Sequence, residues 1–248
     1  MRQAANTPKK KKHIFLHPTF IIFFVAIVVG TSYVLFFNRP KEEVEPTILA
    51  IVAEKAESAS TYTHYCLMIE ESGPGYSLNF SGQVHDDRIY GKIEDYELEI
   101  FSDQNKYYIK SKLADGWQEM EKTELADVPA LIRDPHYLLQ TLLSSKEIFA
   151  EVGTERTVND VLCQTYFLEI PPPDVQLLTR FEKDATLDKL QIYLWYATES
   201  DFMYRMAVMM NIAVGDETIQ INRVYNLDTD ANDFPEGVPV VAEKVTPI

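Results

Sequence analysis

The sequence is poor in glycine and lacks the short motifs that mark common catalytic and nucleotide-binding sites. Nine glycines in 248 residues leave little material for glycine-rich loops, and GxGxxG, GxxxxGK[ST], GxSxG and HExxH are all missing. The five histidines, His13, His17, His64, His85 and His136, show no spacing of a catalytic triad. We therefore predict no catalytic residue, no cofactor and no enzymatic activity.

Acidic residues are missing from the first 40 positions, where six basic residues lie, among them Arg2 and the run Lys9 to Lys12. All 38 acidic residues and 17 of the 23 basic ones follow, so the remainder carries a net charge of −21. Such a charge excludes nucleic acid as an expected partner. It favours a soluble acidic surface, or a surface that meets a basic partner.

The longest apolar run, residues 14–37, holds no Asp, Glu, Lys or Arg and is long enough for a helix across a bilayer. The preceding lysines predict that the N-terminus is cytoplasmic. The alternative is a signal peptide cut near Gly30 to Ser32, but the apolar run continues to Phe37. We expect a cytoplasmic tail (1–13), a transmembrane helix (14–37), a linker (38–46) and an extracytoplasmic domain (47–248) of a bacterial cell membrane protein.

Two cysteines, Cys66 and Cys163, permit at most one disulfide, and both lie in strand-like runs where cysteine is often a buried small side chain. Whether they pair stays open.

No metal site is predicted. Residues 228–233 imitate the first half of a calcium loop, but Asp233 stands where glycine is needed and Pro239 where glutamate is needed. A polar turn is expected there.

Periodicity predicts a mainly β domain with a few helices. Thr47 is a plausible N-cap for an amphipathic helix to about Ser60. Period-two runs from Tyr62 to Leu113 predict an antiparallel meander, with Gly82 as a bend or bulge, and residues 125–148 predict a helical insertion. Strands resume at Phe149, and a last short strand around residues 238–242 brings the expected number to about ten.

The runs 190–197 and 203–214 are apolar on both faces, so both faces need a cover. Four methionines in one strand, with nearby aromatic residues, suggest two interpretations: an ordinary adaptable core, or the wall of a cavity for a hydrophobic ligand. The candidate wall consists of Tyr193, Trp195, Met203, Tyr204, Met206, Met209 and Met210.

Several phrases occur in an order that resembles the LolA/LppX-like lipoprotein superfamily of the bacterial envelope. They are a Gly116-Trp117 turn, Val152-Gly153-Thr154-Glu155, residues 163–168 (CQTYFL), residues 190–195 (LQIYLW) and residues 234–238 (FPEGV). The resemblance implies a curved, incomplete antiparallel barrel with helices over its concave face and an apolar cavity between them. No residue of a carrier's ligand lock matches.

Members of that superfamily carry lipids or lipoproteins, or act as sensory and partner-binding domains. The resemblance therefore implies a membrane-tethered half-barrel that binds a lipid or other hydrophobic ligand. The alternative is a non-enzymatic sensory or protein-interaction domain of the cell envelope. A tether argues against shuttling between membranes. An interior filled by side chains would favour the second interpretation.

Overall fold

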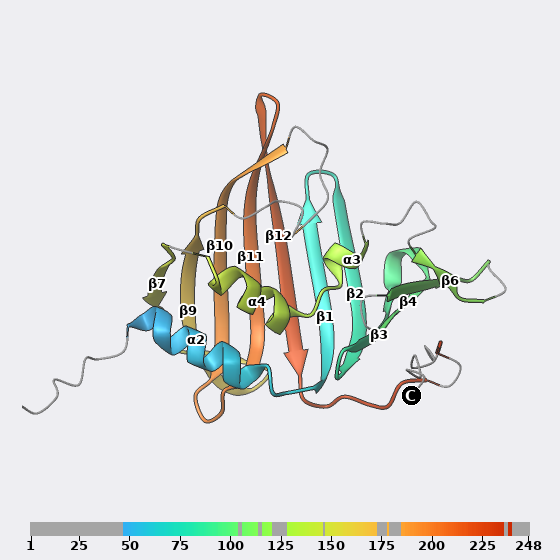
Figure 1. Cartoon of the computed structure of the whole chain (residues 1–248), viewed down its shortest axis with the longest axis horizontal. Coiled ribbons are helices and arrows are strands. Elements are labelled where there is room, and N and C mark those ends of the chain that lie inside the picture. The colour runs from blue at the N-terminus through green and yellow to red at the C-terminus, as the bar shows by residue number, and fades with distance from the viewer. Residues whose placement is uncertain are drawn as a thin grey trace, which may run out of the picture. The chain divides into compact units, whose positions relative to one another are not determined.

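The computed structural model describes residues 47–103, 106–113, 116–120, 128–145, 147–172, 178, 185–235 and 238–239. Pro46–Ile248 form one compact unit, in which helices lie across one face of a broad sheet (Figure 1). The predicted tail (1–13), transmembrane helix (14–37) and linker (38–46) lie outside the described residues. Within the described part, no helix is long and apolar enough to cross a membrane.

The sheet is antiparallel, curved and open, and it contains twelve strands rather than about ten. Its order is β6-β5-β4-β3-β2-β1-β12-β11-β10-β9-β7, with β8 paired to β9. The strands are β1 His64–Gly73, β2 Tyr76–His85, β3 Arg88–Ile93, β4 Leu98–Asp103, β5 Lys106–Ser111, β6 Gln118–Glu119, β7 Phe149–Val152, β8 Arg156–Val158, β9 Val161–Ile170, β10 Ala185–Ala197, β11 Met203–Val214 and β12 Glu217–Asp228.

Two consecutive meanders make up this sheet, and the pairing of β1 with β12 joins them at the centre. As a result β6 and β7, which follow each other in the chain, lie at opposite edges of the sheet. The segment between them must cross one face. It carries the short helix α3 (Val128–Leu131) and helix α4 (Pro135–Leu143), as Figure 1 shows. We call the face that the helices cover the inner face.

Helix α2 (Ile48–Ala59) begins where the sequence predicts, at Thr47, whose side-chain oxygen accepts a hydrogen bond from the Ala50 N–H at 3.2 Å. Its buried residues, Val52, Ala56 and Ala59, face the sheet. Because they recur at helical spacing, one face of the helix is apolar and loses its contact with water on packing.

Helix α4 lies beside α2 on the inner face and contributes Leu138, Leu139 and Leu142 to the same core. Asp134 caps it, and Pro135 occupies its first turn, where a missing N–H costs nothing. Fully burying a leucine side chain stabilises a fold by about 1.5–3 kcal/mol. Packing of the helices against the sheet is therefore a major part of the unit's stability.

Local details differ from the sequence prediction in three places. Gly82 is not a bulge, because it pairs directly with Gly91 in unbroken register. An added Cβ at either glycine would lie within 2.7 Å of the Phe80 ring, so both glycines make room for that ring. Tyr96 belongs to a short 3-10 helix, Glu94–Tyr96, instead of a strand. Residues 238 and 239 are not in a strand, and the rest of the predicted last strand lies outside the described residues.

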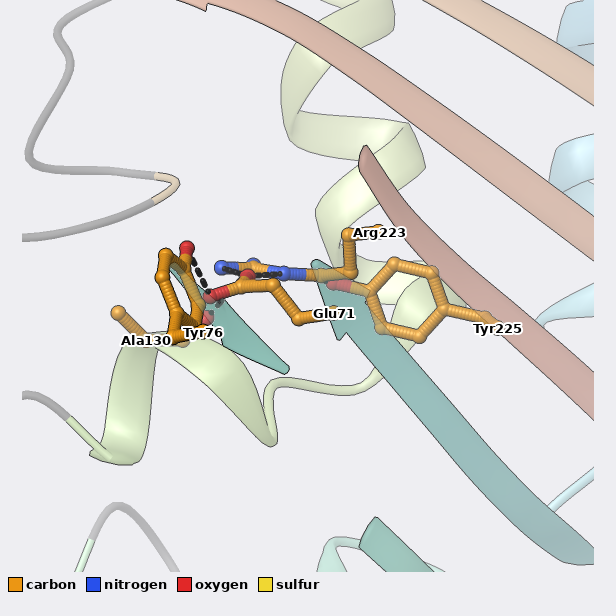
Figure 2. A network of polar contacts seen from close by, with 5 residues as sticks. All are labelled: Glu71, Tyr76, Ala130, Arg223 and Tyr225. Atoms are coloured by element: carbon orange, nitrogen blue, oxygen red, sulfur yellow. Dashed lines mark hydrogen bonds and ion pairs between the residues drawn. The ribbon is translucent and has the colours of Figure 1, made fainter. Parts of the chain in front are cut away.

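A buried ion pair connects the inner face of the two central strands to α3 (Figure 2). The Arg223 side chain is 2% exposed, and its Nε and Nη2 both face one oxygen of Glu71. The second oxygen of Glu71 accepts a hydrogen bond from the Tyr76 hydroxyl at 3.1 Å. Arg223 also donates to the Tyr225 hydroxyl at 3.3 Å and to the Ala130 carbonyl at 3.1 Å. Each charge is thus compensated inside the core, as burial requires.

We expect Arg223→Met to lower the free energy of unfolding by about 3–5 kcal/mol, because the Glu71 carboxylate would stay buried without a cation. The double variant Arg223→Met/Glu71→Leu should recover most of that loss, since it removes both charges. Urea unfolding of the three proteins at neutral pH measures the difference. A single variant that costs less than about 1 kcal/mol would show that the fold does not need the pair.

Candidate functional site

The seven residues of the predicted cavity wall divide between the two faces of the sheet. Met203, Met206 and Met210 are fully buried in the core on the inner face. Met209 and the three aromatic residues, Tyr193, Trp195 and Tyr204, are half-buried, and of these Tyr193 pairs across to Ala207 and Trp195 to Arg205 on the opposite, outer face. The seven residues therefore do not line one cavity.

On the outer face, Tyr193 and Trp195 belong to a row of aromatic side chains across β7, β9 and β10, which we call the outer aromatic strip. Ring centroids are 6.4 Å apart for Phe149 and Phe167, 5.0 Å for Phe167 and Tyr193, and 6.2 Å for Tyr193 and Trp195. The Arg205 guanidinium lies 5.5 Å from the Trp195 ring. Phe149 is 54% exposed, so the strip is partly open to solvent.

Between the helices and the sheet, the described apolar side chains form one continuous core. An open cleft, which we call the α4 cleft, lies beside this core at the N-terminal end of α4 and has a volume of about 580 Å³. That volume is typical of small-molecule sites. Four separate parts of the chain meet there: the loop after α2, the β2–β3 turn, strands β4 and β5, and the start of α4.

The apolar part of the cleft is continuous with the core. Ile89 lines the cleft and also belongs to the buried core. Tyr62 and Tyr107 line the cleft and pack against that core. Burial raises the pKa of the Tyr107 hydroxyl, so this group stays neutral at physiological pH. The inner wall of the cleft is therefore a surface that an apolar group can contact.

Asp134, the N-cap of α4, also lines the cleft. One of its oxygens accepts the Tyr137 backbone N–H at 2.9 Å, and the other accepts the buried Tyr65 hydroxyl at 2.5 Å. Burial and the adjacent Asp134 carboxylate raise the pKa of Tyr65, which keeps its proton for this bond. The bond between helix cap and central strand fixes where α4 begins.

His136 lies in the wall of the cleft, in the first turn of α4, and is 4% exposed. Its ring packs edge-on against Tyr65 with centroids 5.4 Å apart. Neither ring nitrogen has a hydrogen-bond partner among the described residues. Burial lowers the pKa of His136, although Asp134 opposes that shift, so the ring is neutral at physiological pH.

The mouth of the cleft is polar and carries more negative than positive charge. Asp86 and Asp87 occupy the β2–β3 turn, where Asp86 adopts the left-handed backbone conformation with φ of 56°. Arg133, just before the cap of α4, also lines the cleft. With Asp134, the lining holds three carboxylates and one guanidinium. The cleft therefore combines an apolar wall with an acidic mouth.

None of these cleft residues, His136 among them, was predicted from the sequence as a site residue. The two cysteines, whose pairing the sequence left open, are both free. The Cys66 thiol donates to the Asp230 carbonyl at 3.4 Å, and Cys163 is buried. In the described part of the chain, no group of three or more His, Cys, Asp and Glu side chains is arranged to hold a metal ion.

No protein-family model matches the chain, and no curated protein matches its sequence. Solved structures do resemble it. The crystal structure of the Mycobacterium tuberculosis lipoprotein LppX is similar over 76% of this chain and 98% of its own, with a TM-score of 0.49 and 11% identity. A DUF1329 family protein from Desulfovibrio piger is similar over 75% of this chain and 93% of its own, with a TM-score of 0.31 and 10% identity.

The buried neutral state of His136 predicts acid sensitivity. The pKa of His136 is lower in the folded protein than in the unfolded chain, where it is about 6.5. The contribution of the neutral ring to the free energy of unfolding is therefore fully present above about pH 6.5 and is lost as the pH falls through the lowered pKa. One such group changes the free energy of unfolding by at most about 1.4 kcal/mol per pH unit. We expect His136→Phe, which keeps a ring beside Tyr65, to remove this component.

Urea unfolding from about pH 8 to about pH 5 measures the effect, with His64→Phe as the matched control, because His64 is an exposed histidine on β1. Carboxylates contribute to the pH slope of every protein in the series, so the comparison between variants isolates His136. An unchanged slope in His136→Phe would contradict a buried neutral imidazole.

Proposed function

We propose that this chain is a membrane-tethered extracytoplasmic domain that binds a lipid or other hydrophobic ligand, with the α4 cleft as the entrance. The observation that supports the proposal most directly is the cleft itself. It is an open space on the helix-covered face, and Ile89 belongs both to its lining and to the buried core. The tether rests on the uncharged run of residues 14–37 and on the lysines before it.

The ligand's apolar part would enter between α4 and the sheet. Buried core side chains lie there, so entry requires some of them to move aside as the ligand arrives. Three residues of the candidate wall, Met203, Met206 and Met210, lie in that core and can move in this way. Methionine has three rotatable bonds and a polarizable sulfur, and it repacks at low cost. The short helix α4, nine residues long, is the other adaptable part.

Native mass spectrometry of residues 46–248, secreted and purified gently, tests the proposal. We expect a reproducible fraction of the protein to carry an added mass of lipid size. Gln140 is an exposed residue of α4 that lines the cleft, so Gln140→Trp should narrow the entrance and reduce that fraction several-fold. Glu151→Trp on β7, away from the cleft, is the matched control and should leave it unchanged.

A clean mass for the unmodified protein that persists after incubation with a bacterial membrane lipid extract would overturn ligand binding. Equal loading of Gln140→Trp and Glu151→Trp would place the ligand elsewhere. In either case the fold of each variant is checked by its circular dichroism, so that loss of loading is not confused with loss of structure.

A second function, a sensory or protein-interaction domain of the bacterial cell envelope, is favoured by the outer aromatic strip. The strip combines the exposed Phe149 with half-buried aromatic rings and with Arg205 beside Trp195, and aromatic residues and arginine are enriched at interface centres. The charge of −21 on the chain after residue 40 suits a basic partner. If this function holds, Phe149→Ser should weaken crosslinking to an envelope protein in intact membranes. Crosslinking that is absent, or equal with and without the substitution, would count against it.

A further inference from the structure

We propose that the polar end of the ligand is a cationic group rich in hydrogen-bond donors, namely the primary ammonium head group of an amphiphile, held at the mouth of the α4 cleft. This inference rests on the proposed function, and it names the chemistry of the ligand at the same site. Three observations concern the charge of that group, and a fourth shows that a polar group can find a partner in the cleft.

The first observation is the charge at the mouth. The cleft is lined by the carboxylates of Asp86, Asp87 and Asp134 against the single guanidinium of Arg133. No ion pair of Asp86 or Asp87 is seen among the described residues. An anionic head group would meet a net negative mouth, whereas a cation would be attracted to it.

The second observation is that negative charge at the β2–β3 turn already perturbs its surroundings. Asp103, at the end of the neighbouring strand β4, has a raised pKa, first because it is buried and then because Asp87 is close. Arg88 and Lys106 oppose this shift without cancelling it. Counted together, the three carboxylates of Asp86, Asp87 and Asp103 and the two cations Arg88 and Lys106 leave one net negative charge at this turn.

The third observation is the aromatic lining. The rings of Tyr62, Tyr107 and Tyr137 line the cleft, and a tyrosine face attracts a cation through its negative quadrupole. Tyr137 is 60% exposed, so its ring is open to an approaching head group. The same rings offer apolar surface to the first methylenes of a chain.

The fourth observation is an imidazole without a partner. His136 is 4% exposed and lines the cleft, and its ring nitrogens have no partner in the described part of the chain. A neutral imidazole has one acceptor nitrogen and one N–H donor, and buried polar groups normally have a partner. An ammonium can donate to the acceptor nitrogen, and an anion can accept from the N–H, so His136 indicates a polar ligand group here while the charge of the lining selects its sign.

Three amphiphiles with the same ten-carbon chain test the inference: decylammonium, decyl glucoside and decanoate, each kept below its micelle concentration. Isothermal titration calorimetry with residues 46–248 gives a dissociation constant for each. We expect decylammonium to bind at least about tenfold more tightly than decanoate, with decyl glucoside between them, because the mouth attracts one charge and repels the other.

The double substitution Asp86→Asn/Asp87→Asn should reduce the ratio of the decanoate to the decylammonium dissociation constant by at least about fivefold. Asparagine tolerates the left-handed conformation of position 86, so the turn is expected to fold. Glu151→Gln/Glu155→Gln changes the net charge equally but lies on and after β7, outside the cleft. This control should keep the ratio, because the effect of the carboxylates at the mouth is local.

The outcomes separate the two proposals. Equal binding of all three amphiphiles, or preference for decanoate, would overturn the cationic head group and leave hydrophobic-ligand binding standing. Failure of every amphiphile to bind would overturn both. A preference for decylammonium that survives Asp86→Asn/Asp87→Asn, or is lost equally in the control, would show that overall charge and not the cleft selects the cation.

Discussion

The architecture depends on one pairing, that of β1 with β12 at the centre of the sheet. This pairing joins the first and the last strand of the domain and leaves β6 and β7 at opposite edges, although only α3 and α4 separate them in the sequence of elements. Because the connection must cross the sheet, one face is covered by helices. The cleft is the space that this crossing leaves open beside the start of α4. Topology therefore determines where the cleft lies.

Two polar clusters hold the crossing segment in place on the apolar inner face. Arg223, compensated by Glu71, reaches the Ala130 carbonyl of α3, and Tyr65 reaches the Asp134 cap of α4. Each cluster fixes a short helix to a central strand by groups that are fully paired, which is the condition for polar groups to be tolerated in a core. His136 is the contrast, since it lies between these helices and strands without a partner in the described residues.

Much of the fold was predictable because local patterns determine it. The Thr47 cap was confirmed, most of the period-two runs form strands with Tyr96 as an exception, and the predicted helical insertion holds the two short helices α3 and α4. The faces of β10 and β11 were not predictable, because both sides are apolar and periodicity cannot tell which side the helices cover. The cleft was missed for another reason: its residues come from four distant segments that only the tertiary fold brings together. One local pattern in the sequence pointed to part of the cleft. Asp134 followed by Pro135 is typical of a helix cap and first turn, and it places His136 at the start of the helix.

Binding at the α4 cleft makes a direct prediction for hydrogen–deuterium exchange of residues 46–248 with and without a saturating amphiphile. A ligand that enters between α4 and the sheet should slow exchange in two separate segments, residues 134–143 and the β2–β3 turn at Asp86 and Asp87, and leave the outer aromatic strip unchanged. Slowed exchange confined to β7, β9 and β10, or no change in either place, would contradict the cleft as the binding site.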